Sequence, residues 1–451
     1  MTATTPGIAP PLHRGRRFRA WTLLNWVPIV LVLASLLVTG VVTVRHTQAL
    51  SPLDEWVYYD YTLKIPSQGI VHRGETLGKG ALEQMSCFGD AYGRRGDPCG
   101  SDYSDLSRYP QGAKTSADIY PPTYFAVTWA IGEAIHAVTG IDFLTAARLS
   151  GLFWLSGGVL VLYLLLRRFG VPKLVTLGVG LIVIASPSTY WSSTYISTDA
   201  PVLLAGAAAL LIAFRAIDGK GGGWWLVPIA VVCALTKVTT LLGVGLAVLI
   251  LLMYALWRRG TEPLGRDHRR RLILIAVVSA VAAVAAQVLW IGVRALIAVG
   301  PAIGQGVESA GPIGVRWLLT MATVFVDPGP LLFAGWNPGW RLPAIVQLPM
   351  QWLPIAGVVG ALFMATRSIA TKAFGIATAV SLVVFAPLLA LAMSVALGGV
   401  YPVPPRYGIA LIPAFMTALA LIVRNRLATW LLIGYGAFCC VVIVVYAILH
   451  R

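Results

Sequence analysis

The sequence predicts an all-α integral membrane protein, a polytopic bundle of about eleven transmembrane helices. Of its 451 residues, 57% are hydrophobic and only 12% are charged, and the mean hydropathy is +0.78. Apolar runs of about 20 residues, the length at which a helix crosses a bilayer, recur from residue 22 to residue 448. No large soluble domain fits in the segments that remain.

The apolar segments are separated by short polar stretches. The first segment follows a group of arginines, is longer than the core of a signal peptide and lacks a small-residue cleavage site, so we expect it to remain as an anchor. Residues 1–21 are then a cytoplasmic tail, and residues 22–451 form a single transmembrane domain. The segments lie near residues 22–44, 121–139, 144–166, 174–190, 201–217, 223–236, 238–257, 272–298, 343–365, 373–395, 406–422 and 427–448.

The basic residues determine the predicted orientation. The net charge is +16, but the basic residues cluster between apolar segments, as the positive-inside rule expects, and do not indicate a nucleic-acid partner. The stretch from Arg258 to Arg271 carries six arginines and is expected on the cytoplasmic side, together with the N-terminus. The C-terminus then lies outside, and so do the two long loops, residues 45–120 and 299–342.

This orientation requires that residues 121–139 do not cross the membrane as one full span. The segment starts with Pro121 and Pro122 and contains Glu133 and His136, so we expect a juxtamembrane or re-entrant helix. The loop before it, residues 45–120, holds ten of the eighteen acidic residues. The polar chemistry is therefore expected on the outer face.

Two cysteines of the first long loop, Cys87 and Cys99, would form a disulfide if that loop is extracytoplasmic. The bond would stabilise the loop by about 3 kcal/mol. The alternative is a pair of free thiols. The other three cysteines, Cys233, Cys439 and Cys440, fall in apolar segments and are expected to be small packing residues.

Two adjacent acids, Asp54 and Glu55, follow the first apolar segment and are the main catalytic candidates. Ser51-Pro52-Leu53-Asp54 matches a capping box, in which Asp54 would only start a helix by binding the amide of Ser51. In the functional interpretation, a helix on the membrane surface holds one carboxylate beside a lipid-borne substrate, where it accepts a proton from an attacking hydroxyl. The capping interpretation also predicts an aromatic belt at the lipid headgroups, formed by Trp56, Tyr58, Tyr59 and Tyr61.

Other polar residues lie next to apolar segments. Asp199 would either cap the segment 201–217 or serve a site on the outer face. Lys237 interrupts the apolar stretch 223–257, and an ionisable residue at membrane depth is a functional candidate unless it snorkels to the interface. Arg406 lies at the outer mouth of a span, where the positive-inside rule does not favour arginine, so we expect an anionic partner such as a phosphate.

Along the chain, these motifs resemble those of the GT-C superfamily of membrane glycosyltransferases, particularly the protein O-mannosyltransferase and aminoarabinose-transferase branch. Asp54-Glu55 resembles the acidic motif of the first external loop. The segment Tyr120-Pro121-Pro122-Thr123-Tyr124 is similar to the Pro-Pro-aromatic segment. Thr198-Asp199 stands at the start of a span, in the same order along the chain as in the family. Pro405-Arg406-Tyr407 resembles an Arg-Tyr element before a late span.

The resemblance implies a GT-C-like fold and a sugar transfer with inversion from a polyprenyl-phosphate donor. The acceptor would be a cell-envelope glycan, lipid or protein on the extracytoplasmic face of the plasma membrane. Asp54 would be the catalytic base, with Glu55 beside it. Donor and substrate binding would fall to Arg406, Lys237, Tyr407, Asp199 and Tyr120. No cofactor is firmly implied; two adjacent acids would accommodate a divalent metal, but no set of metal ligands is evident.

A transporter or flippase of lipid-linked or polar solutes is the alternative function. It would predict charged residues deep within several spans and an internal inverted repeat. The sequence has few of the former and no sign of the latter. A non-catalytic scaffold of the same fold is a third interpretation.

Overall fold

The computed structural model describes residues 26–51, 54–257, 265–301, 314–322, 324–326, 344–363, 368–397 and 403–449. These residues are almost entirely helical, and the strand pairing among them is limited to isolated bridges from Leu50 to Asp90 and from Thr76 to Lys114. The all-α prediction is therefore confirmed. Several predictions concern residues outside the described ranges: the tail 1–21, Pro52, Leu53, residues 258–264 of the arginine-rich stretch and most of the loop 299–342.

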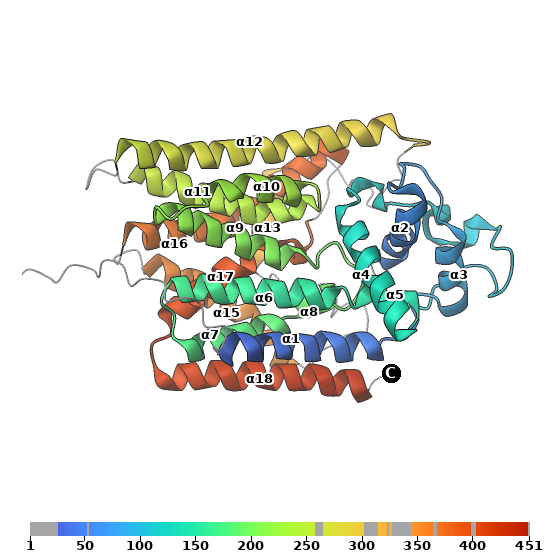
Figure 1. Ribbon diagram of the computed structural model, residues 1–451, viewed down its shortest axis with the longest axis horizontal. Helices are drawn as coiled ribbons and strands as arrows, with labels where there is room; N and C mark the ends of the chain where they lie inside the picture. Colours follow the sequence, from blue (N-terminus) through green and yellow to red (C-terminus); the bar gives the residue numbers. More distant parts are fainter. Residues whose placement is uncertain are drawn as a thin grey trace, which may run out of the picture.

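The apolar segments form a bundle in which the long helices lie side by side (Figure 1). Each predicted segment other than 121–139 contains one of its helices, because long apolar runs can satisfy their backbone polar groups in a membrane only as helices. The helices are α1 (Trp26–Arg45), α6 (Gly151–Arg168), α7 (Lys173–Ala185), α9 (Val202–Ile217), α10 (Leu226–Ala234), α11 (Leu241–Trp257), α12 (Arg266–Leu296), α15 (Ala344–Phe363), α16 (Ile369–Leu397), α17 (Ile412–Ile422) and α18 (Arg426–Leu449). Shorter pieces beside them are α8 (Pro187–Ser192), α13 (Val315–Met321) and η6 (Val324–Val326).

Among the described residues, seven helical segments are long and apolar enough to cross a membrane. Four shorter apolar helices accompany them: Lys173–Ala185, Val202–Ile217, Gly223–Ala234 and Trp352–Phe363. The protein is thus a multi-pass membrane protein by the length and composition of its helices. The number of eleven spans and the orientation of the termini stay predictions.

The loop that follows α1 folds with α4 and α5 into a lobe at one end of the bundle (Figure 1). This lobe, called the end lobe below, contains its own core, in which the ring of Tyr61 stacks on that of Phe125 with centroids 4.0 Å apart. Its helices are α2 (Glu55–Gln68), α3 (Lys79–Phe88), η1 (Leu106–Arg108), η2 (Pro110–Ala113), η3 (Ala117–Ile119), α4 (Thr123–Thr139) and α5 (Phe143–Arg148).

Helix α4 covers the segment for which the sequence predicts a juxtamembrane or re-entrant helix. It packs on α2 and α5 in the end lobe and is not one of the seven candidate spans. The predicted aromatic belt is wrong, however, because Trp56, Tyr58, Tyr59 and Tyr61 are all buried inside the lobe. These side chains build a core instead of facing lipid headgroups.

Two interruptions in the apolar stretches matter for the site. Helix α10 ends at Ala234, and after Lys237 the chain resumes as η5 (Val238–Thr240), which leads into α11. The last but one span begins as a 3-10 helix, η9 (Pro405–Leu411), because Pro404 and Pro405 prevent an earlier start to regular helix. Lys237 thus lies just after the end of a regular helix, and Arg406 lies just before the start of one.

A disulfide joins Cys87 at the end of α3 to Cys99, with a Cα–Cα distance of 4.5 Å. It closes a short loop on the surface of the end lobe. The three other cysteines, Cys233, Cys439 and Cys440, are buried free thiols in the bundle.

We predict that replacing both disulfide cysteines, as Cys87→Ser with Cys99→Ser, lowers the stability of the end lobe by about 3 kcal/mol, because the open loop regains conformational entropy when it unfolds. Thermal unfolding of the purified protein in detergent measures the effect. Reductant should lower the unfolding temperature of the wild type to that of the double variant and leave the variant unchanged. An unchanged wild type in reductant would contradict a stabilising role for this bond.

Candidate active site

A cavity of about 450 Å³ lies where the end lobe meets the bundle. Its polar lining includes Asp54 and Tyr120 from the lobe and Lys237, Arg406 and Tyr407 from the bundle. A more apolar part is lined by Val238, Ile291, Leu389, Ala392 and Met393. The cavity is therefore amphipathic, with charged groups beside an apolar wall.

Asp199 forms the base of the charged part. Its side chain is only 3% exposed; Oδ1 lies 2.5 Å from Nζ of Lys237, and Oδ2 lies 3.2 Å from Nε of Arg406. The alternative that Asp199 caps α9 does not hold, because no side chain caps this helix. The alternative that Lys237 snorkels to the interface does not hold either, because its side chain is only 2% exposed. A buried carboxylate shared by two cations orients both of them toward the cavity.

Asp54 and Arg406 lie beside each other in the lining of the cavity. Asp54 Oδ2 lies 3.8 Å from Nη2 of Arg406, and the Asp54 side chain is 43% exposed, which leaves it open to the cavity. Asp54 precedes α2 with φ at 57°, a left-handed conformation that aspartate tolerates better than most residues, and its carboxylate makes no capping bond. The side chain is thus available to a ligand.

Aromatic side chains surround the two cations. The ammonium group of Lys237 lies 4.9 Å from the ring centre of Tyr407 and 5.7 Å from that of Tyr120. Tyr58 and Tyr120 join their hydroxyls at 3.2 Å. Burial raises the pKa of both tyrosines well above its usual value, so both hydroxyls stay neutral. Tyr58 donates its proton to Tyr120, and the hydroxyl of Tyr120 can donate in turn.

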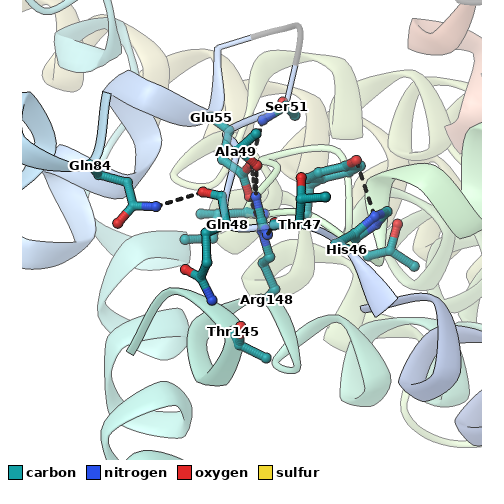
Figure 2. A network of polar contacts seen from close by, with 12 residues as sticks. His46, Thr47, Gln48, Ala49, Ser51, Glu55, Gln84, Thr145 and Arg148 are labelled. Carbon is teal, nitrogen blue, oxygen red and sulfur yellow. Dashed lines mark hydrogen bonds and ion pairs between the residues drawn. The ribbon is translucent and has the colours of Figure 1, made fainter. Parts of the chain in front are cut away.

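Glu55 points away from the cavity into a network at the junction of lobe and bundle (Figure 2). It is fully buried and pairs with Arg148 through two bonds, from Nε to Oε1 at 2.9 Å and from Nη2 to Oε2 at 2.8 Å. Its oxygens also accept from the amides of Ser51 at 2.7 Å and Ile196 at 2.9 Å. All the acceptor capacity of this carboxylate is used within the protein.

The capping box predicted for this stretch is therefore wrong, because the N-cap of the helix is Asp54 and not Ser51. The carboxylate that binds the amide of Ser51 belongs to Glu55, and the helix begins at Glu55 after Asp54. The predicted role of Glu55 beside the catalytic base has no support in this geometry, because the side chain does not reach the cavity.

Arg148, which the sequence interpretation missed, holds this junction together. Besides Glu55 it binds the carbonyls of Thr47 and Ala49, at 3.0 and 2.8 Å (Figure 2). Its guanidinium also lies over the ring of Tyr195. The signal that could have found it is an arginine inside the predicted apolar segment 144–166, since a charge there needs a partner.

Two side chains of α12 fix another wall of the cavity. The indole of Trp290 donates to the carbonyl of Ile119 at 3.0 Å, and Arg294 pairs with Asp118 at 2.6 Å. Both contacts hold η3, which immediately precedes Tyr120.

A metal centre is not evident in the part of the chain that the structure describes, where no three His, Cys, Asp or Glu side chains converge. Asp54 and Asp199 are instead both directed at Arg406. Asp54, Asp199, Lys237 and Arg406 carry two negative and two positive charges. The arrangement can bind an anion through its cations and accept a proton at Asp54.

Part of this chain is similar to a known protein family. Residues 128–299 match the family model described as dolichyl-phosphate-mannose-protein mannosyltransferase. No curated protein matches the chain significantly. The segment that matches the family model includes Asp199 and Lys237 but neither Asp54 nor Arg406.

Solved structures of two transferases are similar to the chain. One is ArnT from Cupriavidus metallidurans bound to undecaprenyl phosphate, with 18% identity and a TM-score of 0.49 over 92% of this chain and 62% of that chain. Another is the archaeal oligosaccharyltransferase AglB from Archaeoglobus fulgidus in complex with an inhibitory peptide and a dolichol-phosphate, with 16% identity and a TM-score of 0.47 over 94% and 56%. The chain spans less than two thirds of either protein.

The resemblance drawn from the short motifs is confirmed by the family match. Its segment runs from within α4 to just beyond α12 and so contains the central part of the bundle. Over residues 128–299, the chain is similar to the family described as dolichyl-phosphate-mannose-protein mannosyltransferase.

Proposed function

We propose that the protein is an inverting glycosyltransferase that moves a sugar from a polyprenyl-phosphate donor to a hydroxyl of a glycan, lipid or protein acceptor. The observation that carries the proposal is the convergence of Asp54, Lys237 and Arg406 on one amphipathic cavity. The family match to dolichyl-phosphate-mannose-protein mannosyltransferases supports the class of donor. A sugar joined to a lipid phosphate has the charged and apolar parts that such a cavity can accommodate.

In the proposed reaction, the donor phosphate binds at Arg406 and Lys237. The acceptor hydroxyl gives its proton to Asp54 as its oxygen attacks the anomeric carbon of the sugar. The bond from that carbon to the phosphate oxygen breaks, and polyprenyl phosphate leaves with the electron pair. Because attack and departure occur on opposite faces of the carbon, the configuration inverts.

The cations act on the leaving group. Departure of a phosphate needs stabilisation of negative charge more than protonation, and positioned cations provide it. Asp199 is a positioning residue here, because it holds Lys237 and Arg406 together without lining the cavity itself. The hydroxyl of Tyr120, which accepts a hydrogen bond from Tyr58, can donate to a sugar or phosphate oxygen.

The proposed site faces the extracytoplasmic side of the plasma membrane. The disulfide Cys87–Cys99 in the end lobe supports this side, because disulfides persist in oxidising compartments. The opposite end of the bundle carries Arg167, Arg168 and Arg266, as the positive-inside rule expects of a cytoplasmic end. The long loops 45–120 and 299–342 would then both be outside.

The test is a transfer assay in membrane vesicles supplied with polyprenyl-phosphate mannose carrying a labelled sugar. We predict that Arg406→Gln raises KM for the donor about tenfold to a hundredfold, because the phosphate loses a charge-assisted hydrogen bond. Arg424→Gln, which changes an exposed arginine distant from the cavity, is the matched control and should leave KM unchanged.

The same vesicles separate the two functions. Movement of the labelled lipid across the membrane without transfer of its sugar would favour the transporter over the transferase. Equal KM values for Arg406→Gln and wild type would remove Arg406 from the donor site.

A further inference from the structure

A second cavity, of about 560 Å³, lies at the turn between α9 and α10. It is lined by Leu211, Ile212 and Arg215 of α9, by Gly221 and Gly222 of the turn, and by Trp225 before α10. It shares no lining residue with the candidate active site. The turn belongs to the end of the bundle where Arg168 and Asp218 meet, away from the end lobe.

Arg215 supplies the charge in this cavity. Its side chain is exposed, and its guanidinium forms no hydrogen bond or ion pair with any other residue in the described part of the chain. The nearest acid along the sequence, Asp218, is already paired with Arg168 and Lys220. The cavity therefore presents a positive charge that Asp218 does not neutralise.

The glycine-rich turn, residues 219–223, shapes the cavity. Gly219 and Gly222 have φ of +70° and +93°, which side-chain-bearing residues rarely adopt. A Cβ atom on Gly223 would lie 2.8 Å from the Cβ of Ala216, so the turn packs too closely on α9 for any other residue. The backbone of the turn thus forms the wall opposite Arg215 without filling the cavity.

The rest of the lining is apolar and reaches the surface. Leu211 and Ile212 precede Arg215 by one helical turn and so lie on the same side of α9. Trp225 is 65% exposed, and its neighbour Trp224 is 43% exposed. Exposed tryptophans of this kind are typical of helix ends at the boundary between lipid tails and headgroups.

We propose that this cavity binds an anionic phospholipid, with the phosphate at Arg215 and an acyl chain along Leu211, Ile212 and Trp225. A free phosphate would leave the apolar wall and the tryptophans unused, and a neutral lipid would leave the guanidinium without a counter-charge. Basic pockets between helices on the cytoplasmic side of membrane proteins bind such headgroups. The inference does not depend on the proposed transferase activity.

The site lies at the closed end of a helical hairpin whose open end belongs to the catalytic cavity. Asp199 precedes α9 by three residues, Lys237 follows α10 by three, and the two form an ion pair. A lipid at the turn would therefore stabilise the hairpin that carries this pair.

The test uses the full chain, purified in detergent and titrated with brominated phosphatidylglycerol, which quenches nearby tryptophans. We expect saturable quenching that brominated phosphatidylcholine does not produce, and Trp225→Phe should reduce its amplitude. Arg215→Gln should weaken the binding of phosphatidylglycerol about fivefold, the effect of one basic residue on an anionic lipid. Arg424→Gln, an exposed arginine that does not line the cavity, should bind as the wild type does.

Three results would overturn the proposal. Equal weakening by Arg215→Gln and Arg424→Gln would mean general attraction to the basic surface. Displacement of the lipid by inorganic phosphate at comparable concentration would mean a free-phosphate site. If quenching is unchanged in Trp225→Phe, the lipid binds elsewhere. Because this variant retains the charge of Arg215, it remains informative if Arg215→Gln does not fold.

Discussion

Asp54→Asn is expected to lower the turnover of sugar transfer about a hundredfold to ten thousandfold, the usual contribution of a general base. Asparagine has nearly the same shape and also tolerates the left-handed backbone of this position, so the fold should be preserved. The amide cannot take the proton of the acceptor hydroxyl. The measurement is the rate of transfer from polyprenyl-phosphate mannose in vesicles at saturating donor.

The control for this variant is Asp102→Asn, because Asp102 is an exposed acid of the same lobe that does not line the cavity. It should retain the wild-type rate. The binding of donor should be largely kept in Asp54→Asn, since the proposed phosphate ligands are untouched. Full transfer by Asp54→Asn would remove the assignment of this residue as the base.

Glu55→Gln is expected to destabilise the protein by about 3–5 kcal/mol, since it leaves the buried Arg148 without its counter-charge. Unfolding of the purified protein by heat or denaturant measures the loss. The double variant Glu55→Gln with Arg148→Met should recover part of it, because no uncompensated buried charge remains. Asp105→Asn removes one partner of the exposed ion pair with Arg108 in the same lobe and should change stability far less than Glu55→Gln.

Activity distinguishes a structural Glu55 from a catalytic one. The folded fraction of Glu55→Gln should transfer sugar far faster than Asp54→Asn, because Glu55 does not reach the cavity. A loss as large as that of Asp54→Asn, in protein that is as stable as the wild type, would restore Glu55 to the catalytic machinery.

Asp54 and Glu55 illustrate how far the sequence could be interpreted. The residues around them predict that a helix starts here, and the structure has a helix that starts at Glu55. Asp54 precedes the helix in a left-handed conformation and Glu55 is its first residue, and only the side chain of Asp54 lines the cavity. Which one does so depends on Arg148, which lies 93 positions further along the chain. Local pattern contains no information about that partner.

Arg406 illustrates the converse case. The sequence identified it as an arginine at a place where charge statistics do not favour one, and therefore predicted an anionic partner. In the structure its partners among the acids are Asp199 and Asp54. The predicted phosphate would have to join this cluster, and that part stays a proposal.

The helical membrane character of the chain, the places of its apolar helices and the resemblance of its short motifs to those of membrane glycosyltransferases could all be predicted from the sequence. These properties follow from the length and composition of contiguous segments, because backbone groups in a bilayer must be satisfied within each helix. The three-dimensional arrangement was needed to see that Asp54 faces the cavity, that Glu55 binds Arg148, and that Asp199 joins Lys237 to Arg406. Those outcomes depend on charges that are far apart along the chain and meet only because buried ions need partners.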